Sequence, residues 1–164
     1  AWLESWLDDW RNRNPQLVVT CHAEVADTLE GSAPWDSLEL VLNGLLNNSM
    51  QAYARLAACS STQSTGLGQP VAIKLNQVDG MLCIEVEDRA GGFDKDVINR
   101  LGREPIWQEA ADTHRGMGLY LSLGLMERAG GFLQFLQVLE HGQLVGARVL
   151  LTVPLTQSVE KVPV

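Results

Sequence analysis

Residues 36–55, DSLELVLNGLLNNSMQAYAR, carry the pattern that decides the fold. Leucines recur there at three- and four-residue steps, which places them on one face of an α-helix: Leu38, Leu42, Leu45 and Leu46. Three asparagines interrupt the same segment, at positions 43, 47 and 48. Asparagine is a mediocre helix former, because its side chain competes for backbone hydrogen-bonding groups. The stretch therefore predicts a long amphipathic helix whose amides either face solvent or perform a function.

The composition is that of one globular domain, with 164 residues, of which 46% are hydrophobic and 20% charged. The net charge of −8 argues against a general nucleic-acid-binding surface. Three widely spaced cysteines, at positions 21, 59 and 83, form no metal-binding motif and indicate a reducing cytoplasm. No apolar run approaches the ~18 residues of a membrane span. We therefore expect a cytoplasmic domain that contacts neither nucleic acid nor membrane.

Hydrophobic alternation predicts a sheet made largely of hairpins. Residues 71–78 and 81–87 flank Asp79-Gly80, and residues 132–139 and 145–153 flank His141-Gly142. A further strand is expected at residues 16–22. Helices are expected at residues 2–13, 36–55 (with Asp36 as N-cap), 94–101 and 116–129. This order predicts an α+β fold, a two-layer α/β sandwich whose mixed, largely antiparallel sheet is covered on one face by helices.

Two glycine clusters and one asparagine carry possible chemistry. Asp88 ends a predicted strand and precedes Gly91-Gly92, so that a carboxylate lies beside backbone that a flat ligand can approach closely. Gly116-Met117-Gly118 opens a helix, where free N–H groups favour an anion, and His114 and Arg115 add positive charge there. Asn48 offers an amide oxygen suited to Mg²⁺. Taken singly, each glycine motif is more often an ordinary turn, and the alternative for Asn48 is a backbone cap or a side chain that faces solvent.

The order of these motifs resembles the ATP-binding catalytic domain of bacterial sensor histidine kinases, in the superfamily that includes gyrase, Hsp90 and MutL. An asparagine-bearing helix, Asp-x-x-Gly-Gly after a strand, a lid-like loop and Gly-x-Gly at a helix start follow one another over residues 17–154. The closing GARVLLTVPL (residues 146–155) is similar to the last strand of the family. RGMGLYLSLGLMERAGG (residues 115–131) is most similar to the redox-responsive sensor kinases.

The resemblance implies ATP and Mg²⁺ as ligands and gives each motif a role. Asn48 would coordinate Mg²⁺ that bridges the phosphates, and Asp88 would accept a hydrogen bond from the adenine amine, helped by an ordered water. Gly91 and Gly92 would let the nucleotide approach. Gly116 and Gly118 would bring N–H groups to the phosphates.

The resemblance also places positive charge in the lid, which would span residues 102–115. Arg115, with His114, would meet the phosphates, so that Asn48 and Arg115 carry the catalytic role. Leu119 would be an apolar neighbour of the base, as would Leu45 and Ile98, although core packing alone is the better explanation of these three side chains.

Three positions depart from the family pattern. Ala90, two residues after Asp88, stands where the family pattern has its first glycine. Gly44 lies one turn before Asn48, where the ATPases of the superfamily carry a glutamate, so no base is available to activate water and rapid hydrolysis is not expected. A one-residue change of register would make Asn47 the metal ligand, although LLNNS matches the family pattern LL-x-N-A best with Asn48.

The expected reaction needs a histidine acceptor that this chain does not supply. The family places it on a separate dimeric helical hairpin, after which a response regulator takes the phosphoryl group; His22, His114 and His141 do not fit that motif. We expect residues 1–15 to be a helix or linker from an upstream domain, residues 16–156 the ATP-binding catalytic domain and residues 157–164 a tail. The simpler alternative for residues 1–15, which the apolar spacing favours, is a helix that packs on the domain. Such a domain belongs to the cytoplasmic portion of a membrane-bound sensor.

Two alternatives remain open at this point. The chain could be a degenerate nucleotide-binding or partner-binding module without kinase activity, in which Ala90 and Gly44 mark a weakened site. An ATPase of the gyrase type is disfavoured by Gly44.

Overall fold

The computed structural model describes residues 2–24, 31–59, 69–93, 95–101 and 117–157. The elements in chain order are α1 (Trp2–Arg13), β1 (Val19–Glu24), β2 (Gly31–Ser32), α2 (Trp35–Cys59), β3 (Val71–Val78), β4 (Met81–Asp88), α3 (Lys95–Arg100), α4 (Met117–Arg128), β5 (Phe132–Glu140), β6 (Gln143–Pro154) and β7 (Thr156–Gln157).

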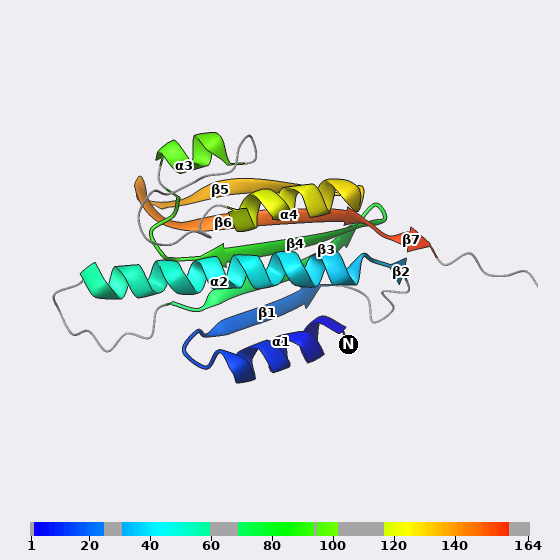
Figure 1. The fold of residues 1–164 in the computed structure, drawn as a ribbon, viewed down its shortest axis with the longest axis horizontal. Coiled ribbons are helices and arrows are strands. Elements are labelled where there is room, and N and C mark those ends of the chain that lie inside the picture. The colour runs from blue at the N-terminus through cyan, green and yellow to red at the C-terminus, as the bar shows by residue number, and fades with distance from the viewer. Residues whose placement is uncertain (1, 25–30, 60–68, 94, 102–116, 158–164) are drawn as a thin grey trace, which may run out of the picture.

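A five-stranded sheet with the order β1-β3-β4-β6-β5 forms one layer. β1 runs parallel to β3, with Val19 opposite Val71, and the other three neighbouring pairs are antiparallel. Helices α2 and α4 lie side by side across one face of this sheet, and α1 lies next to β1 (Figure 1). The predicted two-layer sandwich with a mixed, largely antiparallel sheet is confirmed.

The leucine face of α2 forms the centre of the core. Leu38, Leu42 and Leu46 are fully buried against inward-facing side chains of the strands, such as Ile84 and Leu151. Each such side chain contributes about 1.5–3 kcal/mol when it is removed from water. The predicted helix is confirmed, but it begins at Trp35, so Asp36 lies in the first turn and the predicted N-cap is wrong.

Both predicted hairpins close with two residues of positive φ. Asp79 and Gly80 have φ of 49° and 75°, and His141 and Gly142 have φ of 50° and 78°. Positive φ at both central residues is the geometry that a two-residue hairpin turn requires, because it matches the twist of the strands. The short sequences Asp-Gly and His-Gly therefore fix which strands are neighbours.

The first strand lies further along the chain than predicted. The N–H of Leu17 donates to the carbonyl of Asn14 at 3.2 Å, so residues 14–17 form a turn after α1. β1 begins only at Val19, where pairing with β3 starts. Arg11 fixes α1 to this strand, since its Nε and Nη2 donate to the carbonyl of Val19 at 3.1 and 2.9 Å.

Helix α1 is part of the core, into which it buries four side chains, Leu3, Trp6, Leu7 and Trp10. Its Trp2 ring also lies 4.7 Å from that of Trp35 at the start of α2. A second sheet of two short strands, in which β2 pairs with β7, was not predicted.

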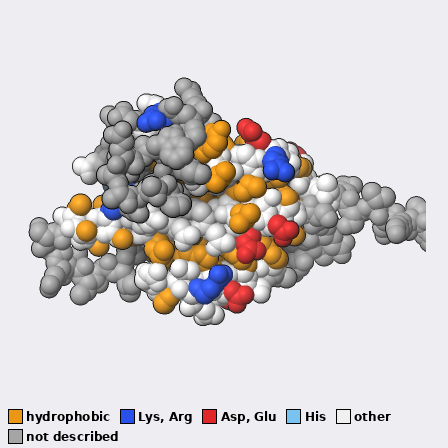
Figure 2. All heavy atoms as spheres, viewed as in Figure 1, with side chains coloured by type: hydrophobic (Ala, Val, Ile, Leu, Met, Phe, Trp, Pro, Cys, Tyr) orange, Lys and Arg blue, Asp and Glu red, His pale blue; other side chains and the backbone are white. Residues whose placement is uncertain are grey.

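The helix-covered face exposes apolar side chains among interspersed acidic and basic ones (Figure 2). The exposed apolar residues include Leu40 of α2 and Leu121 of α4. None of the helices in the described ranges has the length and apolar character needed to cross a membrane.

Candidate functional site

Asp88, the last residue of β4, is held by three hydrogen bonds from three different segments. Its Oδ1 accepts from the N–H of Ala90 at 3.0 Å and from the N–H of Ala147 on β6 at 3.3 Å. Its Oδ2 accepts from the hydroxyl of Ser49 on α2 at 2.7 Å. The carboxylate is thereby fixed at the point where β4, β6 and α2 meet.

The turn after Asp88 requires glycine. Gly91 and Gly92 have φ of 90° and 76°, in the region that side chains with a Cβ rarely adopt. A Cβ at Gly92 would also lie 2.8 Å from the carbonyl oxygen of Gly146. The close approach at Gly92 is to the β5–β6 hairpin, whereas a Cβ at Gly91 would make only an ordinary contact with Leu56 at 3.9 Å. The approach of a nucleotide to these two glycines stays a prediction.

Gly146 allows β6 to lie against the end of β4. A Cβ at this position would overlap the carbonyl oxygen of Asp88, so only glycine permits the approach that brings the Ala147 N–H to the carboxylate. Ala90, which replaces a glycine of the family pattern, is buried and gives its N–H to the same carboxylate. The substitution at Ala90 leaves this turn intact.

A small cavity of about 30 Å³ opens beside Asp88. The side chains that line it are Leu45, Asn48, Ser49, Val86, Asp88, Phe93, Leu119, Ala147 and Val149. Three predicted site residues, Asn48, Asp88 and Leu119, thus meet at one place. Leu45 and Leu119 belong to the core as well as to this lining, whereas Ile98 does not line the cavity.

The two adjacent asparagines of α2 differ in their position. Both are exposed, but Asn48 lines the cavity beside Asp88 and Asn47 does not. The next residue, Ser49, is only 4% exposed and reaches the Asp88 carboxylate. One helix therefore presents a solvent-accessible amide and a buried hydroxyl to the same cavity.

Tyr53, one turn after Ser49, binds the neighbour of Asp88. Its hydroxyl accepts from the N–H of Arg89 at 2.9 Å. Burial raises the pKa of this phenol above its ordinary value, and the nearby charge of Asp88 acts in the same direction. Ser49 and Tyr53 together tie α2 to the end of β4.

The charge of Arg89 is already neutralised. Its guanidinium pairs with Glu87 at 3.1 Å and with Glu140, and the hydrogen bond to Glu140 is the main reason that the pKa of Arg89 is raised. Although it follows Asp88 directly, Arg89 is thus engaged with carboxylates on the rim of the sheet. Asp88 is the only carboxylate among the described residues that line the cavity.

Gly44 lies half-buried where α2 meets α4. A Cβ there would lie 3.8 Å from the hydroxyl of Ser122, which donates to the carbonyl of Gly118 at 2.7 Å. Gly118 itself is exposed near the start of α4, and no atom lies within 4 Å of its Cβ position. The predicted residues His114, Arg115 and Gly116, and the lid at 102–115, lie outside the described residues.

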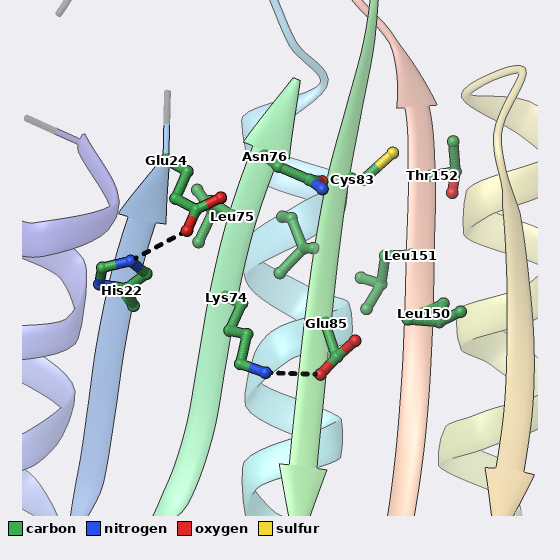
Figure 3. Close-up of a pocket in the computed structure, with 11 residues that line it drawn as sticks. His22, Glu24, Lys74, Leu75, Asn76, Cys83, Glu85, Leu150, Leu151 and Thr152 are labelled. Carbon is green, nitrogen blue, oxygen red and sulfur yellow. Dashed lines mark hydrogen bonds and ion pairs between the residues drawn. The ribbon is translucent and has the colours of Figure 1, made fainter. Parts of the chain in front are cut away.

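A larger hollow of about 290 Å³ lies on the face of the sheet that points away from α2 and α4 (Figure 3). Four of its polar side chains lie in two pairs: His22 lies 3.3 Å from Glu24 and Lys74 lies 3.4 Å from Glu85. We give the smaller cavity more weight, because it brings together an anchored carboxylate, an exposed amide and apolar side chains. Over the described ranges, no group of three His, Cys, Asp or Glu side chains could hold a metal ion.

Sequence reasoning did not single out Ser49, Tyr53 or Gln137 as contacts of this site. Gln137 of β5 binds Phe93 by both halves of its amide, just after the glycine turn. Of these three residues, only Ser49 could have been noticed in the sequence, because it is a polar residue on the leucine-bearing face of α2, directly after Asn48.

Comparisons with known proteins identify the family and the fold of this chain. Residues 34–157 match the family described as "Histidine kinase-, DNA gyrase B-, and HSP90-like ATPase". The structure is similar to the mycobacterial sensor histidine kinase MprB, with 15% identity, a TM-score of 0.63 and coverage of 95% of both chains.

A second similar structure is full-length ShkA in complex with AMPPNP, with 17% identity and a TM-score of 0.66. The match covers 95% of this chain but 30% of the ShkA chain. No curated protein sequence matches the chain. Both structural likenesses concern the fold, whereas the family match covers most of the sequence. The chain therefore belongs to the family of histidine kinase-, DNA gyrase B- and HSP90-like ATPases.

Proposed function

We propose that this chain is the nucleotide-binding catalytic domain of a sensor histidine kinase. In this proposal it binds Mg·ATP at the cavity beside Asp88 and delivers the γ-phosphoryl group to a histidine on the kinase's own dimerisation domain. A response regulator receives the group afterwards. The domain would belong to the cytoplasmic portion of the sensor.

The anchored carboxylate of Asp88 carries the proposal. It faces a cavity with apolar walls, where it can accept a hydrogen bond from the exocyclic amine of adenine. Aliphatic and aromatic side chains such as Leu119 and Phe93 suit the faces of a base. The cavity has room for one water molecule in this structure, so its lining side chains must shift when a base enters.

The described residues supply too few oxygen ligands to hold Mg²⁺ alone, so they suit the ion only when phosphate oxygens also coordinate it. Asn48 supplies one exposed amide oxygen at the cavity, and Mg²⁺ in phosphate sites commonly keeps several waters and takes one or two protein oxygens. Asn48 would hold the ion, which would neutralise phosphate charge. In the same proposal His114, Arg115, Gly116 and Gly118 contact the phosphates.

The cavity favours transfer over hydrolysis. Position 44, one turn before Asn48, has no side chain, and Asp88 is already engaged by Ser49 and two N–H groups. No other described cavity residue could remove a proton from water. In the proposed step the histidine nitrogen bonds to the γ-phosphorus, the bond to the β–γ bridging oxygen breaks and ADP leaves; catalysis consists of positioning and charge stabilisation.

Calorimetric titration of the 164-residue chain with Mg·ATP tests the proposal. We expect the wild type to bind Mg·ATP and Asp88→Asn to lose at least about tenfold in affinity. The reason is that the asparagine NH₂ and the amine of the base are both hydrogen-bond donors, so the bond between them is lost. Asp79→Asn is the matched control: it makes the same charge change in an exposed turn where asparagine tolerates the positive φ. Wild-type affinity in Asp88→Asn would refute the assignment of Asp88.

The kinase activity needs the intact protein. With radiolabelled ATP we expect label on the histidine of the dimerisation domain, and negligible phosphate release by the 164-residue chain alone. Steady hydrolysis by the chain, with no labelled histidine in the intact protein, would instead indicate an ATPase.

A further inference from the structure

We propose that Ser49 is a positioning residue that makes this site selective for a purine carrying an exocyclic amine. The inference rests on the proposed function, because it concerns the base of the same nucleotide. It follows from the hydrogen bonds around Asp88 and from the burial of the serine hydroxyl.

The lone pairs of Asp88 are almost fully used by described groups. A carboxylate has about four acceptor positions, two on each oxygen. Oδ1 accepts from the N–H groups of Ala90 and Ala147, and Oδ2 accepts from the hydroxyl of Ser49. The one remaining acceptor position lies on Oδ2, so a ligand amine must meet the oxygen that Ser49 holds.

Ser49 fixes the direction of that oxygen. The two N–H groups hold Oδ1 in place but leave the carboxylate free to turn about it, and the 2.7 Å bond from Ser49 removes this freedom. A hydrogen bond to an ionised acceptor is roughly twice as strong as a neutral one. The serine is 4% exposed, so water does not compete freely for its hydrogen.

The hydroxyl also determines that Ser49 and Asp88 offer hydrogen-bond acceptors, not donors, to the cavity. Its only hydrogen points to Asp88, so both groups present lone pairs to the cavity. An amine hydrogen is attracted by this arrangement, whereas a carbonyl oxygen at the same place is repelled. Purines with an amine at position 6 are therefore preferred over those with an oxygen or a hydrogen there.

The position of Ser49 couples base recognition to the phosphate end of the site. Asn48 and Ser49 are consecutive on α2, a helix anchored by fully buried leucines. A shift of this helix would move the proposed metal ligand and the base-orienting hydroxyl together. Tyr53 holds the backbone of Arg89 from the same helix, without touching the carboxylate.

The test is a pair of titrations of the 164-residue chain, with Mg·ATP and with the Mg²⁺ complex of purine riboside triphosphate, which lacks the amine. The measured quantity is the ratio of the two affinities. We expect the wild type to prefer ATP by at least about tenfold, as for a hydrogen bond to a charged group. Ser49→Ala should reduce this preference at least about threefold, and Ser49→Thr, which keeps the hydroxyl, should retain it.

Tyr53→Phe is the matched comparator, because it also removes a hydroxyl of α2 that contacts the end of β4. It should weaken both nucleotides alike and leave the ratio unchanged. If Ser49→Ala also weakens both alike, Ser49 is merely structural and the inference is wrong. If Ser49→Ala does not fold, as judged by circular dichroism, Ser49→Cys replaces it and its ratio is read in the same way.

Two wild-type results separate this inference from the proposed function. Equal affinity for both nucleotides would overturn the role of Ser49 while ATP binding stands. Absence of binding for both would overturn the proposed function itself.

Discussion

Gln137 binds Phe93 as a neighbouring strand would, by both halves of its side-chain amide. Its Oε1 accepts from the Phe93 N–H at 2.9 Å, and its Nε2 donates to the Phe93 carbonyl at 2.5 Å. The ring of Phe93 meets that of Phe135, from the same strand as Gln137, edge to face at 6.0 Å. β5 thereby holds the segment that follows the Asp88 turn, which Ser49 and Tyr53 contact from α2.

Replacing Gln137 should loosen this turn. Gln137→Ala leaves the half-buried N–H and carbonyl of Phe93 without these partners, and we expect a loss of about 1–3 kcal/mol in the free energy of unfolding. Urea denaturation measures it. Gln134→Ala is the control, since Gln134 is an exposed residue of the same strand, and it should cost less than about 0.5 kcal/mol. Equal losses would show that the amide bonds contribute nothing specific.

Gly92→Ala should be more costly than Gly142→Ala. Both glycines have nearly the same positive φ, 76° and 78°, which costs about 1–2 kcal/mol for a residue with a Cβ. No atom lies within 4 Å of a Cβ at Gly142, whereas a Cβ at Gly92 meets Gly146 at 2.8 Å. Thermal unfolding should therefore show an additional loss of roughly 1–3 kcal/mol for Gly92→Ala. Similar melting temperatures would contradict the packing of this turn against β6.

The two asparagines of α2 provide a test of the metal assignment. Asn48→Ala should lower the affinity for Mg·ATP by about tenfold and reduce its dependence on Mg²⁺, because an oxygen ligand at the cavity is lost. Asn47→Ala changes a neighbour that is also exposed but does not line the cavity, and it should bind like the wild type. Titrations with and without Mg²⁺ distinguish them. The reverse result would make Asn47 the ligand, through the one-residue shift that the sequence left open.

The reactivity of the cysteines tests the packing of β1, which lies outside the residues matched by the family. Burial raises the pKa of the Cys21 thiol, while the nearby Arg11 lowers it in part. Alkylation proceeds through the thiolate, so at pH 8 iodoacetamide should modify the exposed Cys59 several-fold faster than Cys21. Mass spectrometry of the digested chain gives both rates. In urea, where the chain is unfolded, Cys21 and Cys59 should react at equal rates. Equal rates for the two cysteines in the folded chain as well would contradict the burial of Cys21.

The sequence predicted those parts of the fold that depend on neighbours along the chain. Asp79-Gly80 and His141-Gly142 determine two hairpins locally, and the leucine spacing determines α2. The start of β1 was misplaced because it depends on parallel pairing with β3, about 50 residues away, as in the Thr20–Val71 contact. The pairing of β2 with β7 joins two-residue segments that lie far apart in the sequence, Gly31–Ser32 and Thr156–Gln157, and no local pattern marks it.

In the candidate site, too, some features follow from the local sequence and others depend on how distant segments pack. The motif order predicted that Asn48 and Asp88 belong to one site, and the structure places both on one cavity. Two of the contacts that orient Asp88 come from residues 39 and 59 positions away, Ser49 and Ala147. Their partners follow from the packing of α2 and β6 against β4, which the linear pattern does not specify.

The most direct test of the account is a crystal structure of the 164-residue chain with Mg²⁺ and a non-hydrolysable ATP analogue. We predict that the exocyclic amine of adenine lies about 3 Å from Oδ2 of Asp88, with the Ser49 hydroxyl still on that oxygen and the phosphates toward Asn48. A base bound elsewhere, for example in the hollow beside Lys74 and Glu85 on the open face of the sheet, would contradict it.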